Sequence, residues 1–148
     1  MKVNFFSEKE KAQKIKKELF KCYESTLISG SYTNGPFVKK FENSFKNKLK
    51  SKYCVAVNSG TSALHLALKS LNIGEGDEVI VPSITFLASA AAINYSGAKP
   101  IFVDISKEDW LIDINKIEKH VTKKTKAIMV VHLHGLMCDM KAIKNISK

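Results

Sequence analysis

The sequence predicts an α/β fold in which a mostly parallel sheet is flanked by helices. From residue 53 onward, short apolar runs alternate with helical patterns, as in successive β-α units. The apolar runs show little alternation with polar residues, which is typical of strands that are buried on both faces. The chain has 148 residues, 45% of them hydrophobic and 26% charged, enough for one domain with a sizeable core. We expect an N-terminal helical segment (1–52) followed by a single, incomplete α/β domain (53–148).

The N-terminal segment carries two predicted helices. Ser7 followed by Glu10 is typical of a capping box, and apolar residues at helical spacing extend the first helix to about residue 24. Pro36 suits the first turn of the second helix. The buried stripe of that second helix is expected to be Val38, Phe41, Phe45 and Leu49.

Four strands and four helices are predicted in the rest of the chain. The strands are YCVAV (53–57), DEVIVP (77–82), PIFVDI (100–105) and KAIMVVH (126–132). The helices are expected at 62–72, at 86–95 with Gly97 as a left-handed cap, at 113–121, and from about Asp139 onward.

Composition narrows the functional classes. The net charge is +10, and residues 1–58 account for +8 of it, with 13 lysines against 5 glutamates. Such a basic segment could bind nucleic acid, but no basic residue is arginine, which specific phosphate and base readers usually include. We therefore expect a solvated lysine-rich face and no nucleic-acid partner. The chain shows no signal-like or membrane-length apolar run, and its three cysteines have no metal or disulfide spacing, so we expect a cytoplasmic protein with reduced thiols.

The turn at residues 58–62, NSGTS, is the first candidate site. Gly60 permits close approach of the backbone, and the free amides of the following helix, with the hydroxyls of Thr61 and Ser62, favour a phosphate or another anion. Alternatively, Ser59 or Thr61 simply caps that helix. A dinucleotide is disfavoured because one glycine stands where its fingerprint needs three, and the Gly-Lys-Ser/Thr phosphate loop is absent.

Two further loops leave the expected carboxyl ends of strands. Phe86, in PSITFLAS, could stack on a flat heterocycle or belong to the core. His132 and His134 lie two residues apart, so an extended segment would turn both to one side. No third metal ligand has a convincing spacing, however, and we expect no metal site.

Taken together, these motifs resemble the DegT/DnrJ/EryC1/StrS family of pyridoxal-phosphate-dependent sugar aminotransferases. The resemblance rests on VNSGTSALHLALKSLNIGEGDEVIVPSITFLASAAAINYSGAKPIFVDI followed by TKKTKAIMVVHLHGLMCDM, and a weaker likeness begins at GSYTNGPFVKKFE. It implies the large domain of the aspartate-aminotransferase fold (fold type I), present only in its N-terminal portion. The phrase DWLIDINKIEKHVTKKTKAIMVVHLHG is most similar to the perosamine-synthetase-like branch.

The resemblance also implies a cofactor and a reaction. Gly60, Thr61 and Ser62 match the family's phosphate-binding positions for pyridoxal 5′-phosphate, and Phe86 matches the aromatic residue that stacks on the pyridine ring. The implied reaction transfers an amino group, usually from glutamate, to a nucleotide-linked keto-sugar, for example in cell-surface polysaccharide biosynthesis. His134 stands where the family usually has tyrosine.

No catalytic residue is carried over, because neither the family's cofactor-bearing lysine motif nor its aspartate motif occurs in these 148 residues. The expected partners are a homodimer mate or a chain that supplies the remaining part. The alternative is a non-catalytic fragment or remnant that at most binds the cofactor weakly or pairs with a full-length homologue.

Overall fold

The computed structural model describes residues 8–148, which form two compact units. One unit ends at Ala56, and the other covers Val57–Lys148. The boundary expected from the sequence, between residues 52 and 53, stays a prediction about the domains of the protein.

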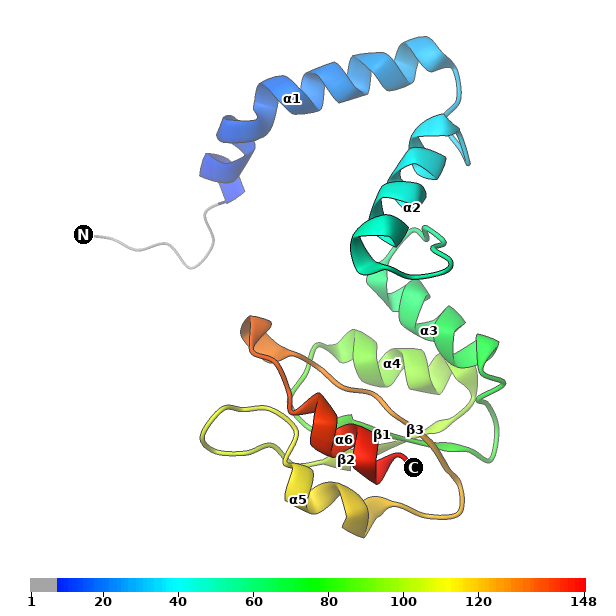
Figure 1. The fold of residues 1–148 in the computed structure, drawn as a ribbon, viewed down its shortest axis with the longest axis vertical. Helices are drawn as coiled ribbons and strands as arrows, with labels where there is room; N and C mark the ends of the chain where they lie inside the picture. The colour runs from blue at the N-terminus through cyan, green and yellow to red at the C-terminus, as the bar shows by residue number, and fades with distance from the viewer. Residues whose placement is uncertain (1–7) are drawn as a thin grey trace, which may run out of the picture. The chain divides into compact units, whose positions relative to one another are not determined.

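The first unit contains two helices, α1 (Glu8–Ser29) and α2 (Pro36–Leu49) (Figure 1). Pro36 occupies the first turn of α2, as predicted, because a missing N–H costs nothing at that position. The helix ends at Lys50, whose left-handed backbone (φ 52°) lets its amide and that of Ser51 return to carbonyls of the last turn. The proposed capping box falls on Ser7, which lies outside the described residues.

The predicted burial of α2 is wrong. Phe41 stacks on Phe45 with ring centroids 5.5 Å apart, so the apolar stripe exists. Its members are nevertheless exposed, apart from the half-buried Val38, and Leu49 shows 60% of its surface. An amphipathic pattern shows which face of a helix is apolar, but it does not show that another element packs on that face. Within residues 8–148, neither α1 nor α2 has a buried residue.

The second unit is built on a parallel sheet, as the sequence predicted, but with three strands instead of four among the described residues (Figure 1). The central strand β1 (Glu78–Pro82) pairs in parallel with β2 (Lys99–Val103) on one side and β3 (Thr125–Ile128) on the other. Every residue from Val79 to Pro82 is buried, which explains why this strand reads as a continuous apolar run.

Helices cover both faces of the sheet. Val79 and Val81 point to one face and pack with residues of α3 (Gly60–Ser70) and α4 (Leu87–Ser96). Ile80 points to the other face, where the core includes residues of α5 (Ile114–Ile117) and α6 (Met140–Ile146). Short 3-10 turns follow α5 at Glu118–His120 and precede α6 at Leu133–Gly135.

Local signals for helix ends are confirmed within this unit. Gly97 closes α4 with φ 90°, and Asp139 caps α6 by accepting hydrogen bonds from the amides of Lys141 and Ala142. Asp113 caps α5 in the same way through the amide of Asn115.

The first predicted strand is wrong, and the fourth is shorter than predicted. Residues 53–57 form no strand in the structure, and Tyr53 and Val55 expose 75% and 78% of their surfaces. A strand exists only as part of a hydrogen-bonded ladder, and no strand pairs with this segment among the described residues. The fourth strand ends at Ile128 rather than at residue 132, after which only the amide of Met129 still donates to the carbonyl of Ile80 (2.7 Å).

Candidate functional site

The N-terminus of α3 carries backbone N–H groups that donate no hydrogen bond within the described residues. Ser59 is the cap: its Oγ accepts from the amide of Ser62 (3.1 Å), and its carbonyl accepts from the amide of Ala63 (3.0 Å). The two preceding amides, of Gly60 and Thr61, have no partner within the described part of the chain, as helix geometry requires of a first turn. A Cβ built on Gly60 meets no atom within 4 Å, so the space above these amides is free. This end of α3 can therefore receive an anion.

Phe86 is the second component of the site. It is the N-cap residue of α4, with φ −67° and ψ 138°, and its side chain is 79% exposed. The alternative that Phe86 belongs to the core is therefore wrong. An exposed aromatic ring at the end of a buried strand is available to stack on a flat ligand.

One pocket joins these two components. It has a volume of about 570 Å³, and α3, the β1–α4 connection, α4 and the segment after β3 all contribute to it. Its lining contains no charged side chain. The lining residues are Gly60, Thr61, Ala63, Leu64, Thr85, Phe86, Ala88, Ser89 and Val131.

The pocket thus brings together three of the four predicted site residues. Ser62 does not line it, because its amide and hydroxyl both bond to Ser59. Sequence reasoning missed Thr85, Ser89 and Val131. Val131 could have been predicted from the sequence. It lies near the carboxyl end of the fourth apolar run, and ligands bind at the carboxyl ends of the strands in parallel sheets.

The histidine loop is a turn in which His132 has a structural partner. His132 and His134 do not lie in an extended segment, because His134 sits in a turn with φ 54°. The Nδ1 of His132 instead accepts a hydrogen bond from the amide of Cys138 (3.2 Å), and the thiol of Cys138 donates to the carbonyl of Val131 (3.2 Å). Among residues 8–148, no three His, Cys, Asp or Glu side chains are grouped to hold a metal ion.

Asp104, the residue after β2, forms an ion pair with Lys116. Its Oδ2 lies 3.1 Å from the Nζ of Lys116, and its Oδ1 accepts from the amide of Ile105 (2.9 Å). The hydrogen bond from Lys116 lowers the pKa of Asp104, and the same contact raises the pKa of Lys116. This arrangement ties β2 to α5 and leaves Asp104 outside the pocket.

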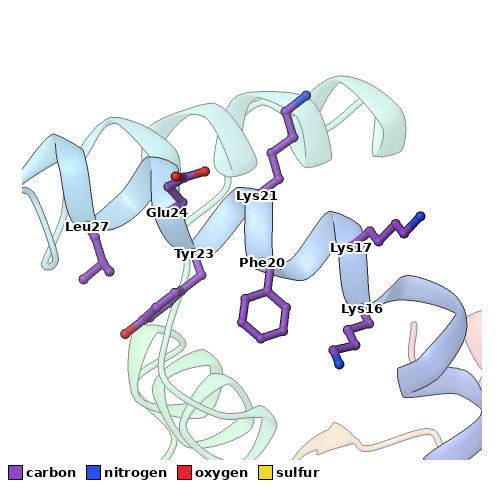
Figure 2. A pocket seen from close by; sticks show the side chains of 7 residues that line it. All are labelled: Lys16, Lys17, Phe20, Lys21, Tyr23, Glu24 and Leu27. Atoms are coloured by element: carbon purple, nitrogen blue, oxygen red, sulfur yellow. The ribbon is translucent and has the colours of Figure 1, made fainter.

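A second hollow, of about 740 Å³, lies along α1 in the first unit. Phe20, Tyr23 and Leu27 project from one side of the helix, and Lys21 and Glu24 from the opposite side (Figure 2). All its lining residues belong to one exposed helix. It is the uncovered face of an amphipathic helix and lacks the convergent polar groups of a ligand site.

Comparison with known proteins decides the family. The profile of the DegT/DnrJ/EryC1/StrS aminotransferase family matches residues 13–148. The chain belongs to this family. The resemblance inferred from the sequence is therefore confirmed.

Relatives and solved structures agree with this assignment. GDP-perosamine synthase of Escherichia coli O157:H7 is 49% identical over 135 residues, which cover 91% of this chain and 36% of the relative. A dTDP-3-amino-3,6-dideoxy-alpha-D-galactopyranose transaminase of Aneurinibacillus thermoaerophilus is 44% identical over 135 residues, covering 91% of this chain and 37% of the relative. DesV of S. venezuelae, solved in complex with a ketimine intermediate, superposes with a TM-score of 0.93 at 38% identity, over 98% of this chain and 39% of DesV. The predicted aminotransferase fold is confirmed.

The chain spans just over a third of the length of these curated relatives. Within the described residues, no helix has the length and apolar character needed to cross a membrane.

Proposed function

We propose that this chain forms the phosphate-binding and ring-stacking part of a pyridoxal 5′-phosphate site in a sugar aminotransferase. The observation that carries the proposal is the pocket shared by Gly60, Thr61 and Phe86, which combines open helix amides with an exposed aromatic ring. Two solved structures that resemble this chain, the PLP and PMP forms of Spr1654 from Streptococcus pneumoniae, support the cofactor (TM-score 0.80, 39% identity, 82% of this chain and 31% of that chain).

The residues present fit such a cofactor. Free amides at the start of α3 and the hydroxyl of Thr61 donate to a phosphate, and the helix dipole favours its negative charge. We assign Ser62 to the same group of donors, with its hydroxyl reoriented from Ser59 to the phosphate. Phe86 offers a ring face to the pyridine. The lining contains no carboxylate that would repel the phosphate.

The cofactor, when bound, supplies an electron sink for reactions at a carbon that bears nitrogen. The residues of this chain then have a binding and orienting role: the start of α3 fixes the phosphate end, and Phe86 fixes the plane of the ring. No lysine in the pocket lining is placed to move a proton. We therefore assign no catalytic residue to this chain and infer that turnover needs the residues that the longer relatives add.

The proposed reaction is the transfer of an amino group from an amino acid, glutamate by family resemblance, to a nucleotide-linked keto-sugar in the cytoplasm. The names of the relatives support a sugar derivative, since they include two sugar-nucleotide enzymes and the spore coat polysaccharide biosynthesis protein SpsC of Bacillus subtilis. A homodimer or a chain carrying the remaining part would complete the active site.

Binding of pyridoxamine 5′-phosphate tests the cofactor site directly. This form carries an amine in place of the aldehyde, so it cannot form an imine with any of the 24 lysines of the chain. We expect induced circular dichroism in its absorption band on adding the 148-residue chain, and no comparable signal with pyridoxamine, which lacks the phosphate. The variant Phe86→Ala should weaken binding about 5-fold or more, since aromatic stacking contributes about 0.5–1.5 kcal/mol beyond buried area.

The matched control is Phe102→Ala, which removes a 51% exposed phenylalanine from β2, outside the pocket lining. Equal binding of pyridoxamine and its phosphate, or equal losses in the two phenylalanine variants, would contradict the proposed site. A chain that binds no cofactor but co-purifies with a full-length relative would instead support the alternative of a non-catalytic, pairing fragment.

A further inference from the structure

A pair of hydroxyl groups brackets Phe86 in the pocket. The Oγ1 of Thr85 and the Oγ of Ser89 lie 2.9 Å apart, one residue before Phe86 and three residues after it. Ser89 is only 6% exposed, and both residues line the pocket. The bond therefore links the end of the strand–helix connection to the first turn of α4.

The backbone of Phe86 is held from both directions by this arrangement. Its carbonyl accepts a hydrogen bond from the amide of Ser89 (3.0 Å), and its neighbour Thr85 is tied to the side chain of the same serine. Its own side chain has no polar atom to hold it in place and is 79% exposed. Packing therefore does little to orient the ring, and the direction of its Cα–Cβ bond depends on the restrained backbone.

We propose that Thr85 and Ser89 are positioning residues that set the backbone of Phe86 for stacking on the cofactor ring; this role rests on the proposed function. The hydroxyl pair fixes the angle at which the chain enters α4, much as a capping box does at other helix starts. Without it, the connection samples other entry angles, and only a fraction of molecules present the ring in the binding orientation. The apparent affinity then falls by that fraction.

The variant Thr85→Val tests the proposal because it keeps the β-branched shape and removes the hydroxyl. We expect pyridoxamine 5′-phosphate to bind about 3- to 10-fold more weakly, the range that corresponds to one net hydrogen bond. The induced circular dichroism per bound cofactor should also change, because it reports the orientation of the ring relative to the chain. Thr85→Ser retains the hydroxyl and should restore both the affinity and the signal.

Ser96→Ala is the control for a purely structural effect. Ser96 lies in the same helix, is 3% exposed, and donates its hydroxyl to the carbonyl of Ile93 (2.7 Å), away from the pocket lining. This variant should lower the stability of α4 without changing the dichroism per bound cofactor. If it changes binding and dichroism as much as Thr85→Val does, or if Thr85→Val binds like the unmodified chain, the positioning role is overturned.

Hydrogen exchange of the free chain separates this proposal from the cofactor site. Thr85→Val should speed exchange of the Ser89 amide, with or without a ligand, whereas Ser96→Ala should leave that amide unchanged at early times. Unchanged exchange at Ser89 overturns the restraint itself. Faster exchange together with no cofactor binding by the unmodified chain shows that the restraint exists but that the proposed function, and with it the positioning role, fails.

Discussion

Replacing Gly60 with alanine should stabilise the free chain and weaken its binding of cofactor. Gly60 is the first residue of α3, and its φ lies outside the left-handed region. A Cβ built there meets no atom within 4 Å. Alanine therefore fits the folded backbone without strain, while it restricts the unfolded chain more than glycine does.

The two effects can be given magnitudes. Glycine-to-alanine changes at compatible positions stabilise by about 0.4–1 kcal/mol, which for a unit of this size raises the melting temperature by about 2–8 °C. The added methyl group projects from a residue that lines the pocket, where it obstructs the approach of a phosphate to the amides of α3. Loss of one hydrogen bond to a charged group costs about 1.5–3 kcal/mol, or roughly 10- to 100-fold in affinity.

Thermal and denaturant unfolding measure the first effect, and titration with pyridoxamine 5′-phosphate measures the second. Gly76→Ala is a matched control: a Cβ there also meets open space, but the backbone is left-handed (φ 86°) and the residue lies outside the pocket lining. It should destabilise the chain by about 1–2 kcal/mol and leave the affinity of the folded protein unchanged. If Gly60→Ala is as destabilising as Gly76→Ala, the backbone argument is refuted. If it binds the cofactor as tightly as the unmodified chain, Gly60 does not lie against the phosphate.

Two further changes test the electrostatics and the helix ends. Because Lys116 lowers the pKa of Asp104 in the folded state, the ionised carboxylate stabilises the fold above its unfolded pKa, and this contribution is lost as the pH falls below about 4. Asp104→Asn should therefore flatten the acid side of a low-salt stability–pH curve, and parallel curves for this variant and the unmodified chain would contradict the assignment. Lys50→Gly should increase the helical circular dichroism and stabilise α2 by about 1 kcal/mol, because Lys50 is exposed and has a left-handed backbone (φ 52°). Lys48→Gly, inside the same helix, should instead lower the stability by about 1 kcal/mol. A loss of stability in both variants would show that α2 does not end at Lys50.

Much of the second unit could be predicted because its signals are local. The continuous apolar run of β1 reflects burial on both faces. Gly97 ends α4 through its left-handed backbone, and Asp139 begins α6 through its side-chain hydrogen bonds. The helix ends depend on interactions within a few residues, and the burial of β1, although distant segments provide it, shows in the composition of the strand itself. The candidate phosphate turn was found for the same reason, since one glycine followed by hydroxyl residues at a helix start is visible in the sequence.

Predictions that depended on a distant partner failed. The stripe on α2 and the segment 53–57 are apolar in the pattern expected of buried elements. In the structure, however, the side chains of Phe41, Phe45, Tyr53, Val55 and Val57 are exposed. Periodicity states which side chains prefer to leave water, but it does not identify the residues that cover them. Within the described residues of the first unit, neither helix has a buried residue.

The sequence alone determined the family, the α/β fold and the residues from which a cofactor site could be built, because those depend on short motifs and on the burial pattern of each element. Only the tertiary structure decided which of these residues meet. Packing of α3 and α4 on the same face of the sheet places Gly60 and Thr61 in one pocket with Phe86, although at least 25 residues separate them along the chain. The bonds of Ser62 to Ser59 and of Thr85 to Ser89, by contrast, join residues three and four positions apart and belong to the starts of single helices, whereas the meeting of α3 and α4 requires the sheet on which both pack.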